Sequence, residues 1–392
     1  MQCNHHVPPL YQNKSLFITG VTGMLGKVLL EKMLRTTPGI RIIYVLIRPS
    51  NGKNATQRCE EELFQSRIWE RLRDTSTALG GFSGNKKALL SHLRKKIVAV
   101  DGDLLQGILP QETSLQTSSS TTSIFGISQQ WHDRLEKEGV DIVFHNAATV
   151  NFDEQIDMSI RLNVLAPLKM MELAKRWKCK AYVHVSTAYV VAHQKTKHFS
   201  PERIGTSPKG LNPDELIAKV LELSRNAHSK TPERRKEYMD RVARTLMSPF
   251  PNTYTLTKHI AELKVIALNK TLELPLCIVR PSIIGASLRE PVPGWIDTLS
   301  AAGKYSNRME RASCNGSTVV DISYLPPSFK TCFIVFVLLF SILKHPNKYF
   351  FFNVYNICLD IFYTTLYYTI INIYFFSFEF SCCIYRRWFR YD

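Results

Sequence analysis

Residues 16–26 read LFITGVTGMLG, and residues 27–35 continue as KVLLEKMLR. The first three residues of this stretch indicate a buried strand, and the apolar residues of the second segment recur at helical spacing. Three glycines lie between them. Gly20 permits a tight turn, Gly23 allows the backbone to approach a pyrophosphate, and Gly26 allows the helix to pack closely on the strand. Because N–H groups at the start of such a helix bind phosphates, the stretch predicts a dinucleotide-binding strand, turn and helix.

A glycine pattern alone is weak support, since glycines also occur in ordinary turns. Here the flanking strand and helix supply the context that a dinucleotide fingerprint requires. The spacing TGxxGxxG resembles that of extended short-chain dehydrogenases/reductases. The cofactor contacts predicted in this loop are Thr19, Gly20, Thr22, Gly23, Met24, Leu25 and Gly26.

The composition suits a large core with a basic surface. The chain has 392 residues, 45% of them hydrophobic, and a net charge of +17. Its basic residues are scattered and lack interleaved aromatic residues, which argues against nucleic acid and favours a solvated surface, an anionic substrate or a membrane face. The nine cysteines form no CxxC pair. With no secretory signal at the N-terminus, this predicts reduced thiols facing the cytosol, and neither disulfides nor a metal site.

The next two predicted strands bear on the choice of cofactor. Residues 41–47 form a β-branched run, and Arg48 follows where an NAD enzyme usually carries Asp or Glu. A guanidinium there can pair with the 2′-phosphate of NADP, so NADPH is the expected cofactor; the alternative is an ordinary surface arginine. A third strand at 96–100 leads into Asp103, which is a candidate for adenine contact or a turn aspartate.

A fourth strand begins at residue 141 and runs into Asn146, Ala147 and Ala148. Small residues suit a backbone that approaches the nicotinamide-side ribose. An amphipathic helix is expected at residues 155–178. Asn163 lies near its middle and is notable because Asn is a poor residue for a helix interior. It either binds a water that relays protons to the catalytic lysine or is simply exposed.

Catalytic candidates follow the fifth predicted strand, at residues 181–189. Its carboxyl end delivers Ser186 and Thr187 to the sheet edge, where ligands of open α/β sheets bind. Tyr254 and Lys258 then occur four residues apart, which places both side chains on one helix face. A free tyrosine has a pKa near ~10, and a neighbouring ammonium is expected to shift it toward neutrality.

A sixth strand around 278–284 carries Arg280 and Pro281. The polar segment 195–250, with helices expected at 214–225 and 232–247, is interpreted as an insertion that shapes the substrate pocket. Residues 113–123 are a low-complexity surface insertion.

These features together resemble an alcohol-forming fatty acyl-CoA reductase over residues 14–297. The resemblance rests on the segments TGVTGMLG (19–26), YVLIRP (44–49), FHNAATVNFDE (144–154), VSTAY (185–189), PNTYTLTK (251–258), RPS (280–282) and EPVPGWID (290–297). The last segment is the most discriminating, because the glycine loop and YxxxK alone would also fit a sugar-nucleotide epimerase.

The resemblance implies NADPH-dependent reduction of a long-chain acyl-CoA to an aldehyde and then a fatty alcohol. Tyr254, Lys258, Thr187 and Ser186 would carry the chemistry, with no cysteine nucleophile. Besides the glycine loop, the implied cofactor contacts are Arg48, Asp103, Asn146, Ala147, Ala148, Lys258 and Pro281. The alternatives are another extended reductase, acting on nucleotide sugars or carrier-bound thioesters, and a truncated, membrane-tethered NADPH-binding protein without turnover.

Beyond residue 297 the chain departs from the family pattern. Residues 298–330 are an unassigned linker, and residues 331–392 are strongly apolar. Within them, 361–378 is an uncharged stretch of sufficient length for one transmembrane helix, with arginines after it that favour a cytosolic end. The tail is either a membrane anchor or the product of truncation or mis-splicing.

The sequence therefore predicts an α/β fold, a doubly wound Rossmann-type parallel sheet with a divergent apolar C-terminal tail. A lead-in at residues 1–13 precedes the reductase domain at 14–297. We expect a membrane-associated protein that faces the cytosol, at the endoplasmic reticulum or peroxisome, with acyl-CoA and not nucleic acid as partner.

Overall fold

The computed structural model describes residues 11–76, 81–108, 123–193, 207–227, 229–281, 284–285, 287 and 290–297, together with the backbone of three short strands further on. Most of the predicted low-complexity stretch at 113–123 (residues 113–122) and the predicted span at 361–378 lie outside these residues.

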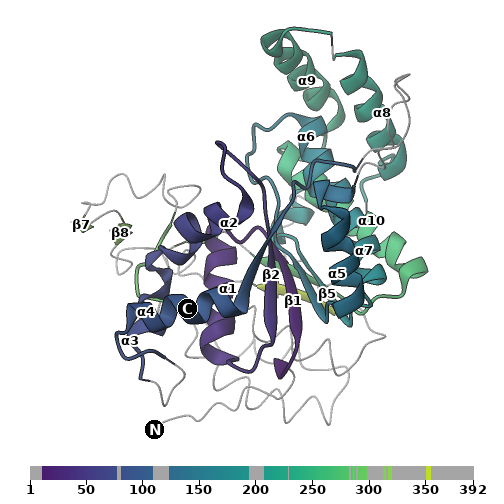
Figure 1. Ribbon diagram of the computed structural model, residues 1–392. Helices are drawn as coiled ribbons and strands as arrows, with labels where there is room; N and C mark the ends of the chain where they lie inside the picture. The colour runs from purple at the N-terminus through teal and green to yellow at the C-terminus, as the bar shows by residue number, and fades with distance from the viewer. Residues whose placement is uncertain are drawn as a thin grey trace, which may run out of the picture.

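A parallel sheet organises the chain (Figure 1), in the order β3-β2-β1-β4-β5-β6-β9. Its first six strands have the Rossmann order, with the reversal between β1 and β4 that creates a ligand crevice at the carboxyl edge. All neighbouring strands are parallel, and Thr19 of β1 lies in register with His145 of β4. The strands are β1 (Ser15–Thr19), β2 (Ile42–Ile47), β3 (Ile97–Asp101), β4 (Ile142–His145), β5 (Ala181–Val185), β6 (Leu276–Pro281) and β9 (Phe350–Val354).

Helices cover both faces of this sheet, so its strands are apolar on both sides. One face packs against α1 (Met24–Thr36), α3 (Glu70–Asp74) and α4 (Lys86–Lys96), with α2 (Ala55–Arg58) beside β3. The opposite face packs against α5 (Gln129–Glu138), α7 (Ala166–Arg176) and α10 (Thr253–Leu272). The predicted α/β doubly wound class is therefore confirmed.

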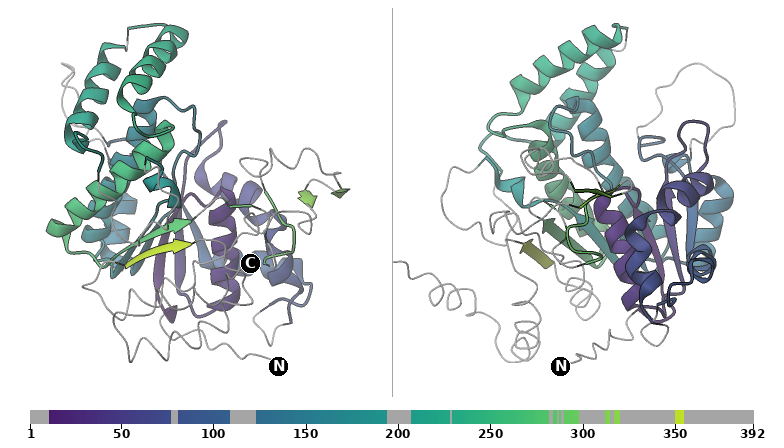
Figure 2. Two further views of the ribbon diagram at one scale, coloured as in Figure 1. Left: turned by 180° about the vertical axis from the view of Figure 1, so that it is seen from behind. Right: turned by 90° about the vertical axis from the view of Figure 1, so that its left-hand side faces the viewer.

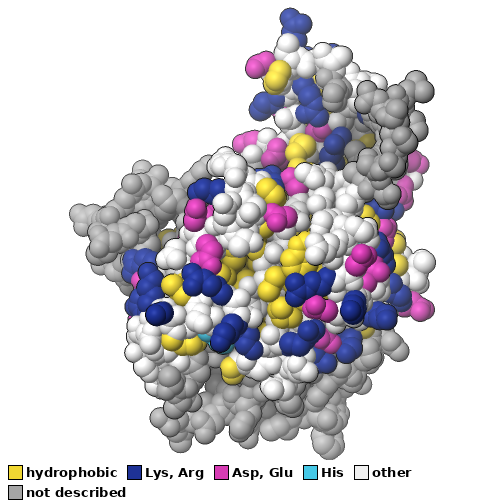
Figure 3. Space-filling view, viewed as in Figure 1, with side chains coloured by type: hydrophobic (Ala, Val, Ile, Leu, Met, Phe, Trp, Pro, Cys, Tyr) yellow, Lys and Arg dark blue, Asp and Glu magenta, His cyan; other side chains and the backbone are white. Residues whose placement is uncertain are grey.

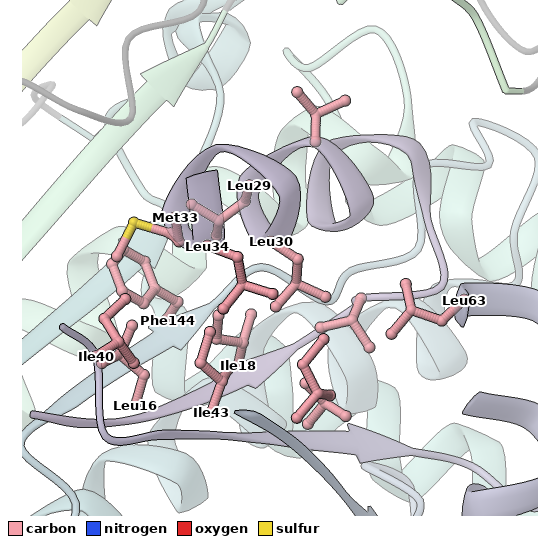
Figure 4. Close-up of a cluster of buried hydrophobic side chains, with 14 of the residues drawn as sticks. Leu16, Ile18, Leu29, Leu30, Met33, Leu34, Ile40, Ile43, Leu63 and Phe144 are labelled. Carbon is pink, nitrogen blue, oxygen red and sulfur yellow. The ribbon is translucent and has the colours of Figure 1, made fainter. Parts of the chain in front are cut away.

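The core under α1 fixes the glycine loop. Leu30 and Met33 of α1 point toward Ile18 of β1 and Phe144 of β4 in Figure 4, and all four are almost fully buried. A buried side chain of this size contributes about 1.5–3 kcal/mol. This packing places the start of α1 at the carboxyl edge of β1 and β4.

The predicted helix at 155–178 is present but not uniform. It consists of α6 (Ile156–Ile160), a wider π-helical turn (Arg161–Leu165) and α7. Pro167 explains the change, because it has no N–H for the carbonyl of Asn163 and its ring crowds that carbonyl.

The segment between β5 and α10 forms two helices, α8 (Pro213–Asn226) and α9 (Pro232–Leu246), which project beyond the carboxyl end of the sheet (Figure 2). Buried Asp157 of α6 anchors them: its carboxylate accepts a hydrogen bond from Ser224 (2.6 Å) and pairs with Arg235. The helices expected at 214–225 and 232–247 are confirmed within two residues.

The apolar tail contributes a strand. Residues 350–354, expected within a hydrophobic tail, form β9 and extend the sheet beyond β6 (Figure 2). A short antiparallel pair, β7 (Ala312–Cys314) and β8 (Ser317–Val319), precedes it. Across the residues that the structure describes, no helix combines the length and apolar character needed to cross a bilayer.

The basic surface is mixed with acidic groups. On the face shown in Figure 3, lysines and arginines alternate with aspartates and glutamates. Exposed pairs such as Arg94 with Glu60 (2.6 Å) illustrate the pattern. A mixed surface of this kind agrees with the scattered charges of the sequence.

The segment 290–297 is clamped onto α1 by charge. Glu290 pairs with Lys32 (2.5 Å) and Arg35 (2.9 Å) of α1 and with Arg71 (3.1 Å), and Asp297 pairs with Lys27 (2.7 Å). Burial acts to raise the pKa of Glu290, but the surrounding cations outweigh it and lower this pKa to about 2. The most discriminating motif of the sequence thus fastens the helix that begins at the glycine loop.

We expect Glu290→Gln to lower the free energy of unfolding by about 2 kcal/mol at pH 7, because it leaves three partly buried cations without their carboxylate. Since the folded pKa lies below the ordinary 4.5, this contribution is present above pH 4.5 and is lost as the pH falls toward 2. Urea unfolding of both proteins between pH 3 and 7 measures it.

Glu237→Gln is the matched control. Glu237 forms an exposed pair with Arg241 on α9, and its removal is expected to change stability by less than about 0.5 kcal/mol. Equal effects of the two substitutions would contradict the clamp.

Candidate functional site

The glycine loop is shaped by two close backbone approaches. Gly20 has a φ of +72°, and a Cβ there would lie 2.9 Å from the Ala147 backbone. A Cβ on Gly26 would lie 2.2 Å from the Gly20 carbonyl oxygen. Side chains are excluded at both positions, so α1 starts directly against the loop. The roles predicted for Gly20 as the turn and Gly26 as the helix contact agree with this geometry.

Gly23 is different, because it is exposed and a Cβ there would meet only the Gly20 oxygen, at an ordinary 3.5 Å. It is the N-cap of α1, which lacks a side-chain cap and has no acidic residue in its first turn. Thr22, Met24 and Leu25 are partly exposed around it. A helix start without cap or carboxylate fits a pyrophosphate, so the cradle suits the predicted dinucleotide.

Thr19 joins the glycine loop to the loop after β4. Its hydroxyl is fully buried and accepts hydrogen bonds from the backbone N–H of Asn146 (3.1 Å) and Ala147 (3.0 Å). The Asn146 amide in turn donates to the Gly20 carbonyl (3.4 Å). Thr19 therefore shapes the crevice from within, while Asn146, Ala147 and Ala148 remain partly exposed along it.

The residues predicted for the adenosine end lie at neighbouring strand ends. Arg48 is exposed directly after β2. Asp103 follows β3 and accepts a hydrogen bond from the N–H of Leu105 (3.0 Å), so one of its oxygens closes a turn. Arg58 of α2 also lies at this edge and was not among the predicted residues. Its guanidinium donates to the Arg48 carbonyl and to both carboxylate oxygens of Glu62 (2.7 and 2.8 Å). Only the fold brings Arg58 to this edge.

Ser186 and Thr187 leave β5 beside Pro281 of β6. The Ser186 N–H donates to the Val279 carbonyl (2.6 Å), and the Thr187 hydroxyl donates to the Pro281 carbonyl (3.4 Å). Among the described residues, the buried Ser186 hydroxyl has no hydrogen-bond partner. An unsatisfied hydroxyl at a ligand edge is a candidate donor to a substrate oxygen.

Tyr254 and Lys258 lie on one face of α10, as predicted, but their electrostatics differ from the expectation. Burial raises the pKa of Tyr254, while a hydrogen bond with Thr187 acts to lower it. A neutral phenol is the form that donates a proton. The expected shift toward neutrality is therefore wrong for this structure, because desolvation outweighs the hydrogen bond with Thr187.

Lys258 is buried and donates a hydrogen bond to the Val185 carbonyl (2.7 Å). Burial lowers its pKa to about 8, and the carboxylate of Glu262 acts against this shift. Glu262 lies one turn further along α10 and forms a buried ion pair with Arg280 of β6, at 2.9 and 2.6 Å. The pair fastens α10 to β6, the strand whose Pro281 carbonyl accepts the hydrogen bond from Thr187.

Asn163 is not exposed, so that alternative is wrong, whereas the water relay stays a prediction. Asn163 is buried, and its amide donates to the Thr149 carbonyl (3.2 Å) and to the Thr257 hydroxyl (3.1 Å). Its oxygen accepts from the Thr149 N–H (2.9 Å). Asn163 therefore ties the loop after β4 to α10.

Two buried histidines underlie the site. His145 and His184 lie in register on β4 and β5 and stack at 6.0 Å. Burial, and next to it the charge of Lys258, lowers the pKa of His145 to about 3 and that of His184 well below its usual range. Both rings are therefore neutral at pH 7.

We expect Lys258→Met to raise the free energy of unfolding at pH 7 by about 1–3 kcal/mol, because it removes the cost of burying an ammonium. The lowered pKa, about 8 against an ordinary 10.5, means that wild type regains stability as the pH rises from 8 to 10.5. The difference between the proteins, measured by denaturant unfolding, should shrink over that range. A pH-independent difference would contradict the buried charge.

Residues 18–312 match an NAD-binding family described as male sterility protein. Fatty acyl-CoA reductase 1 of Mus musculus is 33% identical over 322 residues, covering 79% of this chain and 52% of that protein. Fatty acyl-CoA reductase 8 of Arabidopsis thaliana is 33% identical over 299 residues, covering 74% of this chain and 55% of that protein. The chain spans about half the length of these relatives.

Among solved structures, the terminal R domain of the myxalamid PKS-NRPS pathway is similar, with 24% identity and a TM-score of 0.43. The similarity covers 71% of this chain and 51% of that one. The resemblance drawn from the sequence motifs is confirmed by the family match, and the chain belongs to the male sterility protein family, together with the fatty acyl-CoA reductases that it resembles.

Proposed function

We propose that this protein reduces a long-chain fatty acyl-CoA to a fatty alcohol, through an aldehyde, with NADPH as the reductant. The observation that carries the proposal is the convergence of Tyr254, Lys258 and Thr187 at the carboxyl edge of the sheet, beside a phosphate-binding glycine loop. Relatives named fatty acyl-CoA reductase supply the substrate class.

NADPH is proposed over NADH because of the charge after β2. Exposed Arg48 takes the place of the usual ribose-binding carboxylate, and Arg58 lies against its carbonyl. Two guanidinium groups at this edge favour a 2′-phosphate. The pyrophosphate would lie at the start of α1, around Gly23.

The proposed chemistry uses the chain's own hydroxyls. Reduced nicotinamide supplies hydride when bound. Thr187, with Ser186, donates hydrogen bonds to the carbonyl oxygen as negative charge develops on it. Tyr254 holds the proton that this oxygen receives, and Lys258 stabilises the resulting phenolate. Tyr254 takes this proton back as the carbonyl re-forms and the CoA thiolate leaves, which yields the aldehyde. With a second NADPH bound, the same tyrosine can donate its proton to the aldehyde oxygen, which yields the alcohol.

A membrane location remains part of the proposal. Its support is the composition of residues 361–378, which are uncharged and long enough for one span. Recovery of the full chain in the membrane pellet after carbonate extraction supports it, and recovery in the supernatant refutes it.

We expect Tyr254→Phe to lower turnover of palmitoyl-CoA by at least about 100-fold, because it removes only the proton that the developing oxyanion receives. The affinity for NADPH should stay within about twofold, since the hydroxyl is the sole change. Consumption of NADPH and calorimetric titration measure the two quantities.

Tyr238→Phe on α9 is the matched control, because its ring contact with Lys230 survives the loss of the hydroxyl. It should retain wild-type turnover. A fully active Tyr254→Phe protein would refute the proton-donor role.

We expect Arg48→Ala to raise the KM for NADPH about tenfold and to leave the KM for NADH nearly unchanged, because only NADPH carries the 2′-phosphate. Arg41→Ala is the control: this exposed arginine precedes β2, at the opposite end of the same strand. If Arg48→Ala affects both cofactors equally, Arg48 does not read the phosphate.

A further inference from the structure

The large hydrophobic side chains that remain exposed among the described residues are few and grouped. They are Val150 (63% exposed), Phe152 (57%) and Tyr189 (41%). All three come from segments that flank the catalytic tyrosine. Exposed apolar side chains that are grouped at a functional edge indicate a binding surface.

Two of them lie on the loop at residues 149–154, which is fixed to the catalytic helix from both sides. The Thr253 hydroxyl, next to Tyr254, bonds the carbonyls of Phe152 (3.2 Å) and Glu154 (3.2 Å). Asn163 holds the other end of the loop at Thr149. The loop is therefore preformed relative to Tyr254.

The apolar side chains reach the reacting group itself. The Phe152 ring lies 5.7 Å from the Tyr254 ring, in a tilted arrangement. On the other side, the phenol of Tyr189 lies close enough to Tyr254 to act to raise its pKa, and the Tyr189 N–H donates to the hydroxyl of Thr187, the proposed oxyanion donor (3.3 Å). A carbonyl held by Thr187 and Tyr254 would thus place its substituents beside Phe152 and Tyr189.

The charge beside these residues selects which part of a thioester substrate they receive. Asp153 is exposed and adjacent to Phe152, and Glu154 follows. Two carboxylates repel the phosphates of CoA. An uncharged alkyl chain is not repelled, and burying it against apolar side chains is favourable.

We propose that Val150, Phe152 and Tyr189 form an acyl wall, the surface that receives the first methylenes of the substrate's acyl chain next to the reacting carbonyl. The inference rests on the proposed function and deepens it, because it assigns acyl-chain recognition to residues outside the catalytic and cofactor groups. Phe152, which contacts Tyr254, contributes most of this surface.

The test measures binding without turnover. The full chain, saturated with NADP+, is titrated by calorimetry with CoA and with hexanoyl-, octanoyl-, decanoyl- and lauroyl-CoA below their micelle concentrations. Affinity for wild type should rise with chain length, by up to about threefold per added methylene. Phe152→Ala should weaken lauroyl-CoA binding about tenfold and leave CoA binding within about twofold.

Two further variants separate packing from folding and charge. Phe152→Leu keeps an apolar side chain and should restore most of the lost affinity. Asp153→Asn changes charge only, since the contact of residue 153 with Asn151 is made by its backbone N–H, and it should preserve the dependence on chain length.

Several results would overturn the acyl wall. If Phe152→Ala leaves lauroyl-CoA binding unchanged, or weakens CoA and lauroyl-CoA binding equally, the ring only supports the fold and the proposal is contradicted. A change from dimer to monomer in sedimentation, with an unaltered dependence on chain length, would instead make the surface an interface between copies. If wild type binds acyl-CoA with the expected dependence yet never oxidises NADPH, the proposed function fails and the wall stands.

Discussion

The burial of Lys258 between α10 and the sheet edge is the constraint on which the site depends. An ammonium in this position costs stability, which is expressed in its lowered pKa of about 8. The Val185 carbonyl and the carboxylate of Glu262 partly offset that cost. Lys258 donates to the Val185 carbonyl of β5, and Glu262 pairs with Arg280 of β6. These two contacts fix α10 against two strands. Tyr254 is thereby held one turn away, at the mouth of the crevice.

Hydroxyl and amide side chains complete this arrangement by joining loops that come from distant parts of the chain. Thr19 joins β1 to the loop after β4, and Asn163 joins that loop to α10. Thr253 fixes the same loop beside Tyr254. Each bond is buried or partly buried, so the crevice is held in place before any ligand enters. The start of α1, Tyr254 and the loop at residues 149–154 consequently keep fixed positions relative to one another.

Much of the fold could be predicted from sequence, because its signals are local. The glycine loop, the β-branched strands and the i, i+4 spacing of Tyr254 and Lys258 each specify a nearby structure. The positions of Ser186 and Thr187 followed from the rule that parallel strands deliver ligands at their carboxyl ends.

What could not be predicted depends on contacts between distant segments. The pKa of Tyr254 is set by desolvation from several elements, and Arg58 reaches Arg48 only through the packing of α2. The π-helical turn at Arg161–Leu165 was not predicted, because the apolar residues around it recur at the spacing of a continuous helix despite Pro167. β9 was hidden because its residues lie in a tail whose composition indicated a membrane segment.

The most direct measurement is the stoichiometry of palmitoyl-CoA reduction by the full chain in detergent, with NADPH followed by absorbance and products identified by gas chromatography. We predict hexadecanol as the product, with two NADPH oxidised for each acyl group. NADPH that binds without being oxidised, and palmitoyl-CoA recovered unchanged, would contradict it.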